Sequence, residues 1–180
     1  MKITIIRHAE VDMKWQEYYT SKTFDQACWA YDKSKIKPVE NIKKDIFIEK
    51  VYISELSRTY ETACELFSCK EFDMTELLNE VPLRSFKDTQ KSYPLKTWNV
   101  CGRLQWFFNI KRQQEGRRKT TKRAKKAVAM IERKGKDCYV VTHGFFMITL
   151  IKVLRRNGYR IEREKKNGIN NLEKVIAYKK

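Results

Sequence analysis

The sequence has no long apolar run. Its 180 residues contain nothing close to roughly 18 consecutive apolar positions, the length that suggests a membrane-spanning helix. The first residues also lack the apolar segment of a secretory leader, because Lys2 and Arg7 bracket only four apolar-like residues. We therefore expect no transmembrane segment and a cytoplasmic location.

Paired cysteines are also missing. The five cysteines are odd in number, and no two of them have CxxC spacing; they are Cys28, Cys64, Cys69, Cys101 and Cys138. This pattern argues against a disulfide framework and against a zinc site. We expect reduced thiols packed in or near the core, and a protein that needs neither a metal ion nor another cofactor.

Linkers and internal repeats are absent as well. A chain of 180 residues that is 42% hydrophobic can bury a substantial core in a single domain. We expect one domain over residues 1–180.

Acidic residues are scarce in two segments, and this produces the formal charge of +17. Residues 111–136 carry twelve Lys and Arg against two Glu, and residues 152–180 carry ten against three. A field of this sign attracts polyanions, including phosphorylated substrates and nucleic acid. A charge run is ordinarily a solvated helix face, however, and charge alone indicates attraction rather than recognition.

Only two histidines are present, and each lies one residue beyond a strand-like run. His8 follows the β-branched run of residues 2–6 and Arg7, and His143 follows residues 138–142. Strands of an α/β sheet present their carboxyl ends to the ligand crevice. An imidazole and a cation at such an end are placed for chemistry on an anion.

The remaining pattern alternates strands with helices. A strand at 51–53 is followed by a helix for which Ser57 is the expected N-cap. The apolar spacing predicts that this helix buries Tyr60, Ala63, Cys64 and Phe67.

Further elements follow from the same periodicities. We predict strands at 74–78, 159–163 and 172–178, a loop at 83–97, and helices near 23–32, 98–113, 124–131 and 145–154. The helix at 98–113 is expected to use Val100, Leu104, Phe107 and Phe108 as its apolar face. The alternation favours a three-layer α/β/α sandwich around a mostly parallel sheet.

In such a sheet, the strand tips at 7–8, 53–54, 79–80 and 142–143 can share one edge. Five chemically useful side chains would then meet there: Arg7, His8, Arg58, Glu80 and His143. Each has an ordinary structural explanation when taken alone. A lone histidine can be a hydrogen-bonded core residue, and a helix arginine such as Arg58 can pair with a nearby glutamate.

The combination of three short motifs is more specific. The motifs are Arg7-His8-Ala9-Glu10, Ser54-x-Leu-x-Arg58-x-x-x-Thr62-Ala63 and Val-Thr-His143-Gly144, each after a predicted strand. Together they resemble the signature of the histidine phosphatase superfamily, the phosphoglycerate-mutase-like group, in its small phosphatase branch. The resemblance covers essentially the whole chain, although residues 10–50 and 83–120 match loosely.

The resemblance implies a role for each matching position. His8 would be the nucleophile that forms a phosphohistidine, with one ring nitrogen held by a backbone carbonyl. Arg7, Arg58, His143 and Gly144 would hold the phosphoryl oxygens, and the phosphoryl dianion would keep His143 protonated.

Glu80 is the implied general acid and base, and a carboxyl in this role needs a raised pKa near neutral pH. Its surroundings, Asn79 to Leu83, lack the Gly-x-x-Glu-Gly continuation common in the family. Glu76 and Glu10 are the alternative carboxylates.

The resemblance also implies a cap-like insertion over roughly 83–118. Glu10, Lys87 and Arg103 are candidate substrate contacts, although a solvated loop is the plainer interpretation. The chain lacks the long insertion of the mutases, which favours a phosphatase acting on a phosphorylated small molecule.

Three alternatives stay open. Two are a phosphoglycerate-mutase-type phosphoryl transferase and a phosphoprotein phosphatase, and the third is a basic protein of this fold that binds nucleic acid or an acidic partner. The oligomeric state is also open.

Overall fold

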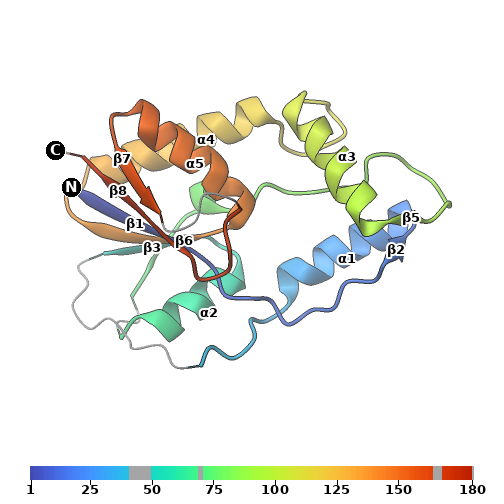
Figure 1. Cartoon of the computed structure of the whole chain (residues 1–180), viewed down its shortest axis with the longest axis horizontal. Helices are drawn as coiled ribbons and strands as arrows, with labels where there is room; N and C mark the ends of the chain where they lie inside the picture. The colour runs from blue at the N-terminus through green and yellow to red at the C-terminus, as the bar shows by residue number, and fades with distance from the viewer. Residues whose placement is uncertain (41–49, 69–70, 164–167, 180) are drawn as a thin grey trace.

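The computed structural model describes residues 1–40, 50–68, 71–163 and 168–179 as a mixed α/β fold (Figure 1). The strands are β1 (Lys2–Arg7), β2 (Tyr18–Tyr19), β3 (Val51–Ile53), β4 (Asp73–Met74), β5 (Tyr93–Pro94), β6 (Cys138–Thr142), β7 (Arg160–Arg163) and β8 (Lys174–Tyr178). The helices are α1 (Ser21–Lys33), α2 (Ser57–Leu66), α3 (Leu95–Phe107), α4 (Arg117–Glu132) and α5 (Gly144–Arg156), with a 3-10 turn at Glu76–Leu78. Within these residues, no helix is both long enough and apolar enough to cross a bilayer.

Six strands form the central sheet in the order β4-β3-β6-β1-β8-β7. The pairs β4–β3, β3–β6 and β6–β1 are parallel, whereas β8 runs antiparallel to both β1 and β7. The predicted mostly parallel sheet is thus confirmed, with an antiparallel edge at the carboxyl end of the chain.

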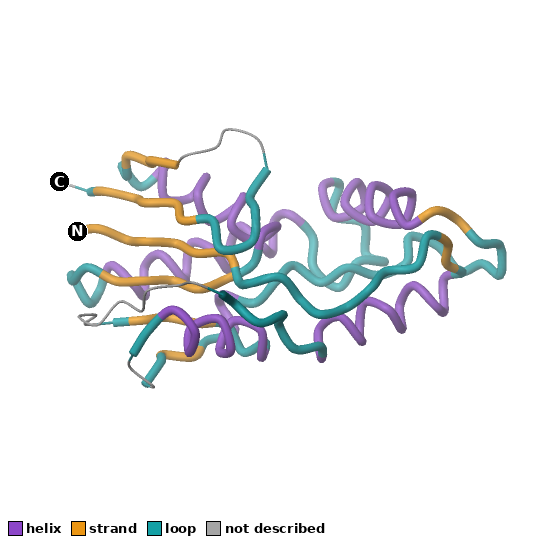
Figure 2. Tube along the Cα trace, turned by 60° about the horizontal axis from the view of Figure 1, so that its bottom comes forward, coloured by secondary structure: helices purple, strands orange, loops and turns teal. Residues whose placement is uncertain are grey.

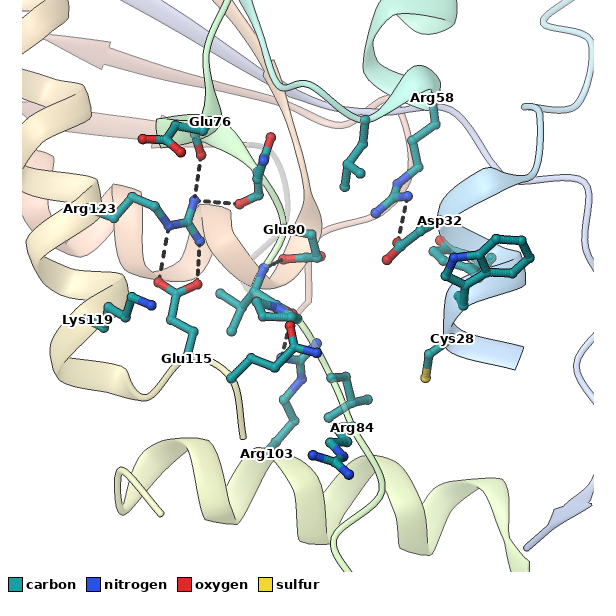
Figure 3. Close-up of a pocket in the computed structure, with 18 of the residues that line it drawn as sticks. Cys28, Asp32, Arg58, Glu76, Glu80, Arg84, Arg103, Glu115, Lys119 and Arg123 are labelled. Atoms are coloured by element: carbon teal, nitrogen blue, oxygen red, sulfur yellow. Dashed lines mark hydrogen bonds and ion pairs between the residues drawn. The ribbon is translucent and has the colours of Figure 1, made fainter. Parts of the chain in front are cut away.

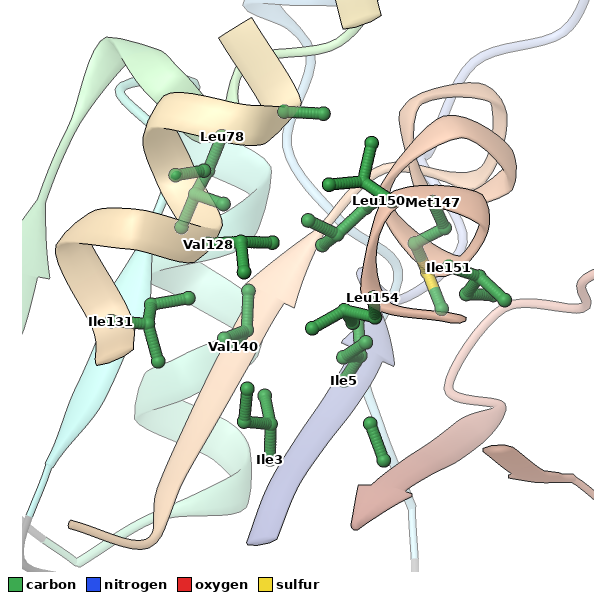
Figure 4. Packing of buried hydrophobic residues seen from close by; sticks show 14 of the residues in the cluster. Ile3, Ile5, Leu78, Val128, Ile131, Val140, Met147, Leu150, Ile151 and Leu154 are labelled. Atoms are coloured by element: carbon green, nitrogen blue, oxygen red, sulfur yellow. The ribbon is translucent and has the colours of Figure 1, made fainter. Parts of the chain in front are cut away.

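Helices cover both faces of this sheet because its central strands are apolar on both sides. Ile3, Ile5 and Val140 pack beneath α4 and α5, and Figure 4 shows this cluster. Ile6 and Val141 point to the opposite face, where they pack against α2. Alternation along each strand therefore divides the core into two layers.

A second lobe extends from one end of the sheet and consists of α1, β2, β5 and α3 (Figure 2). Its small core is aromatic: Trp98 is fully buried, stacks on Phe24 at 5.3 Å between ring centroids and donates from its indole N–H to the carbonyl of Tyr19. Two separate stretches of chain build this lobe. The predicted cap at 83–118 supplies α3 and β5, and α1 and β2 come from the stretch before β3.

One predicted helix face is correct in part, and another is wrong. At α2, Ala63 and Phe67 are buried as predicted and Cys64 is half-buried, but Tyr60 is 44% exposed. The helix buries Arg58 and Thr62 as well. The N-cap of α2 is Leu56 rather than Ser57, and no side chain caps it. The helix turns its polar residues inward because they form buried hydrogen bonds.

In α3 the predicted apolar face points outward. Val100, Leu104, Phe107 and Phe108 are all at least 44% exposed, and Trp98 and Gly102 are buried instead. The helix also begins at Leu95, within the segment predicted as a loop, and ends at Phe107.

The region predicted as a strand at 74–78 is mostly the 3-10 turn after β4. Strands at 159–163 and 172–178 are confirmed as β7 and β8. Cys69 and part of the basic segment 152–180 lie outside the described residues.

Candidate active site

The carboxyl ends of three neighbouring strands bring the motif residues together. Arg7 is paired in register with Thr142, and Ile53 is paired with Val141, so β1, β3 and β6 end at the same edge of the sheet. His8 and His143 each follow directly, and their ring centroids lie 5.1 Å apart. The structure thus places the two histidines side by side, as the strand-tip pattern predicts.

His8 is held in one orientation by its own backbone neighbour. Its Nδ1–H donates to the carbonyl oxygen of Ala9 at 2.6 Å, and a carbonyl can only accept, so Nδ1 carries the proton. Burial, together with the charges of Arg58 and Arg7, lowers the pKa of His8 from 6.5 to about 3. The ring is therefore neutral at pH 7, and Nε2 keeps its lone pair.

The second histidine belongs to a chain of buried hydrogen bonds. The Nε–H of Arg58 donates to Nδ1 of His143 at 3.2 Å, so Nε2 of the neutral ring carries the proton and donates to Oγ of Ser54 at 2.7 Å. Oγ of Ser54 lies 3.0 Å from Oγ1 of Thr59, whose hydroxyl donates to the carbonyl of Leu56. Arg58 only donates, whereas His143, Ser54 and Thr59 each donate one hydrogen bond and accept another, and this series of bonds orients both Arg58 and His143.

His143 is neutral in the protein by itself, and the protonated state predicted for it in contact with a phosphoryl dianion stays a prediction. Its pKa is lowered well below 6.5, first by complete burial and then by the charge of Arg58. Nδ1 could not accept the Arg58 N–H if it carried a proton of its own.

Arg58 is almost fully buried and is held from a second side by α1. Its Nη1 forms an ion pair with Oδ1 of Asp32 at 3.0 Å, and its guanidinium carbon lies 5.1 Å from the centroid of the Tyr31 ring. A guanidinium so restrained would lose little conformational freedom if an anion bound to it.

Arg7 is anchored by the loop before β8 and packs against the start of α5. Its Nη1 donates to the carbonyl of Ile169 at 2.6 Å. A Cβ atom at Gly144 would lie 2.9 Å from Nε of Arg7, so only glycine leaves room for this close approach. The absence of a side chain at Gly144 therefore makes space for the Arg7 guanidinium.

Glu80 reaches the amino end of α5. Oε1 accepts hydrogen bonds from the N–H groups of Val81 and Phe146, both at 2.9 Å, and Oε2 accepts a longer one from Phe145 at 3.3 Å. The amino end of a helix favours negative charge, and this carboxylate supplies it.

Arg123 of α4 braces the segment that carries Glu80. It donates to the carbonyls of Asn79 and Leu77 at 2.7 and 3.1 Å, and it forms a buried ion pair with Glu115 at 2.9 Å. The guanidinium also lies 4.4 Å from the centroid of the Phe146 ring.

A cleft with a volume of about 1480 Å³ opens between the sheet edge and the second lobe. Figure 3 shows Arg58 and Asp32 on one side of Glu80, and Arg123 with Glu115 on the other. Arg7 and Arg103 also line the cleft. His8 and His143, at 2% and 0% exposure, lie behind this lining.

Of the three candidate substrate contacts, one lines the cleft and two do not. Arg103 lies in the cleft, donates to the carbonyl of Val81 at 3.1 Å, and has a pKa lowered by burial. Glu10 is exposed and pairs with Lys37, and Lys87 donates to the hydroxyl of Tyr93 at 2.8 Å; neither lines the cleft. Of the alternative carboxylates, only Glu76 reaches the cleft.

Several residues that shape the site carry no sequence prediction. Ser54 and Thr62 belong to the second motif, and Thr62 accepts the N–H of Ala9 at 2.9 Å while donating to the carbonyl of Arg58. Asn171 donates from its side chain to the carbonyl of His8 at 2.8 Å. The second motif could have identified Ser54 and Thr62 as site residues, because both are motif positions. No local sequence pattern identifies Asn171 or Arg123 as a site residue.

Neither a thiolate at Cys28 or Cys138 nor a metal-binding cluster is found among the described residues. Burial raises the pKa of Cys28 and of Cys138 to about 12, so both remain protonated thiols. Among the described residues, no three His, Cys, Asp or Glu side chains gather where they could hold a metal ion.

Solved structures with this fold include several phosphate-handling proteins. A phosphoserine phosphatase from Entamoeba histolytica in complex with 3-phosphoglyceric acid has a TM-score of 0.60 and 14% identity, covering 97% of this chain and 89% of that chain. A phosphoglycerate mutase from Bacillus anthracis str. Sterne has a TM-score of 0.58 and 18% identity, with 97% and 87% covered. An alpha-ribazole phosphatase from Shigella flexneri has a TM-score of 0.54 and 16% identity, with 96% of each chain covered. At these identities the likeness concerns the fold.

No curated protein matches the sequence. A family model described as the histidine phosphatase superfamily (branch 1) matches residues 3–174.

Proposed function

This chain belongs to the histidine phosphatase superfamily, and from that premise we propose that it hydrolyses phosphomonoesters through a phosphohistidine formed on His8. The observation that carries the proposal is the geometry of His8. Its Nδ1–H is committed to the carbonyl of Ala9, its pKa is about 3, and Nε2 is thereby a neutral nucleophile at physiological pH.

In the proposed first step, Nε2 of His8 attacks phosphorus, an N–P bond forms and the ester P–O bond breaks. Arg7 and Arg58 stabilise the negative charge on the phosphoryl oxygens through charge-assisted hydrogen bonds. Arg7 and Arg58 line the cleft, whereas His8 is 2% exposed, so the phosphoryl group must approach His8 past the residues that line the cleft.

Glu80 is proposed to give a proton to the departing alcohol. Oε2, which makes the longer of the hydrogen bonds to α5, is the oxygen best placed to exchange a proton with a ligand in the cleft. In the second step Glu80 takes a proton from water, the water oxygen attacks phosphorus, and the N–P bond breaks to release phosphate and restore His8.

The direct test is hydrolysis of p-nitrophenyl phosphate between pH 5 and 8 by the wild type and by His8→Ala. The wild type should turn over, and the variant should lose at least about 10³-fold in kcat, as expected when a covalent nucleophile is removed. Inactivity of the wild type on this ester and on a broad phosphoester panel would overturn the proposal. Full activity in His8→Ala would overturn the mechanism.

A further inference from the structure

One wall of the cleft carries a row of lysines from α4. Lys119, Lys122 and Lys126 all line the cleft and are all exposed. Their spacing of three and four residues places them on one face of the helix. The opposite face of α4 is apolar and packs into the core, so the helix cannot rotate to bring other residues to the cleft.

These three lysines, which we call the lysine wall, are not neutralised by neighbouring acids. Within the described part of the chain, no carboxylate lies within ion-pair distance of any of them. The nearby Glu115 is buried in its pair with Arg123, and Glu76 is the remaining acidic side chain at this end of the cleft. The wall therefore presents uncompensated positive charge to whatever enters.

The lysine wall shares α4 with Arg123, which contacts the segment that carries Glu80. Arg123 lies between Lys122 and Lys126 in the sequence and touches the carbonyl of Asn79, the residue before Glu80. Figure 3 shows Lys119 on α4 beside Arg123 and Glu115, on the side of Glu80 away from Arg58. Over seven residues at a rise of about 1.5 Å each, the wall extends about 10 Å along α4.

We propose that the lysine wall binds further phosphate groups of the substrate, so that the substrate is a small molecule with more than one phosphate. This inference rests on the proposed function, because it takes Arg7 and Arg58 as the site of the phosphate that is cleaved. A single phosphate would be satisfied by those two arginines. The volume of about 1480 Å³ exceeds the range of about 300–1,000 Å³ typical of small-molecule sites and leaves room for a larger polyanion.

The experiment compares two triple variants that remove the same charge from the same region. In the first, Lys119, Lys122 and Lys126 are each replaced by Gln. The matched control replaces Arg118, Lys125 and Arg133, which are exposed and do not line the cleft, by Gln. Binding of inorganic tripolyphosphate and of inorganic phosphate is measured by calorimetry, and thermal unfolding confirms that both variants fold.

The wild type should bind tripolyphosphate, and the lysine-wall variant should bind it about tenfold more weakly, because three exposed ion pairs each contribute modestly. Phosphate affinity should change less than about twofold in either variant, and the control variant should keep its tripolyphosphate affinity within about twofold. Equal weakening in both triple variants would overturn the proposal in favour of a general field effect. Absence of tripolyphosphate binding, or no effect of the lysine-wall substitutions, would also overturn it.

Calorimetry needs no turnover, so this result stands apart from the test of the proposed function. A wild type that binds tripolyphosphate through the lysine wall but hydrolyses no phosphoester would keep the binding site and refute the reaction.

Discussion

His8 and His143 are neutral in the folded protein because burial and the nearby guanidinium groups oppose a further positive charge. The sequence could predict that both rings meet at a strand edge, since each follows a buried strand. It could not predict the protonation state of His143, because that depends on which atom of Arg58 faces the ring. The Nε–H of Arg58 donates to Nδ1 of His143, and this side-chain orientation cannot be inferred from the sequence.

The neutral state of His8 predicts how stability depends on pH. Its pKa of about 3 in the folded protein lies below the ordinary value of 6.5, so the unfolded chain binds more protons between these two values. This contribution to stability is fully present above about pH 6.5 and is lost as the pH falls toward 3. We expect the free energy of unfolding, measured with urea at pH 7, 6 and 5, to fall as the pH decreases.

The matched variant is His8→Asn, which cannot titrate in this range. Its free energy of unfolding should fall less steeply than that of the wild type, by up to about 1.4 kcal/mol per pH unit for the one missing proton. Equal slopes in the two proteins would show that His8 has no lowered pKa.

At the scale of elements, the strands were predictable and the helix faces were less so. β1, β3 and β6 are short apolar runs, and burial on both sides leaves little choice for such runs. The buried face of α2 was predicted from apolar spacing, yet it contains Arg58 and Thr62, whose hydrogen-bond partners lie on distant parts of the chain. Periodicity counts these residues as solvent-facing, and only tertiary structure shows their partners.

The amino end of α5 gives a prediction for Glu80. In Glu80→Gln the charge that faces this helix end is removed, and the free energy of unfolding should fall by about 1 kcal/mol. If Glu80 is also the general acid, kcat for an alkyl ester such as β-glycerol phosphate should fall by about 10²–10⁴-fold. The decrease for p-nitrophenyl phosphate should be smaller, because nitrophenolate departs with little help from an acid.

Glu76→Gln is the control, since Glu76 lines the same cleft and makes no side-chain contact with α5 among the described residues. It should leave both rates within about twofold of the wild type, as expected for an exposed side chain away from such contacts. If kcat for the alkyl ester falls more in Glu76→Gln than in Glu80→Gln, Glu76 rather than Glu80 is the general acid.

For the molecule as a whole, the alternation of strands and helices predicted the class of fold, but the sequence did not predict that α1 and β2 belong to the second lobe. Trp98 and Phe24 stack at the centre of that lobe, although 74 positions separate them in the sequence. Local periodicity contains no information about such a contact, so the predicted cap at 83–118 omitted α1. The outward-facing residues of α3 were misassigned for the same reason.

The charge of +17 makes a prediction about nucleic acid. If attraction is purely electrostatic, duplex DNA that binds at about 50 mM salt should lose about 10³–10⁵-fold in affinity by about 200 mM, for 6–10 phosphate contacts. Fluorescence anisotropy of a labelled duplex over this range would measure the slope. Affinity that persists at the higher salt concentration would favour the alternative of a nucleic-acid-binding protein.

We propose that His8 carries the phosphoryl group during turnover, and this intermediate can be detected directly on the protein. Enzyme in excess over a phosphoester labelled on phosphorus is quenched under alkaline conditions during the first turnover, and the labelled peptide is identified by mass spectrometry. We expect label on His8 that appears before free phosphate and is absent from His8→Ala. Label on another residue, or hydrolysis by His8→Ala at the wild-type rate, would contradict it.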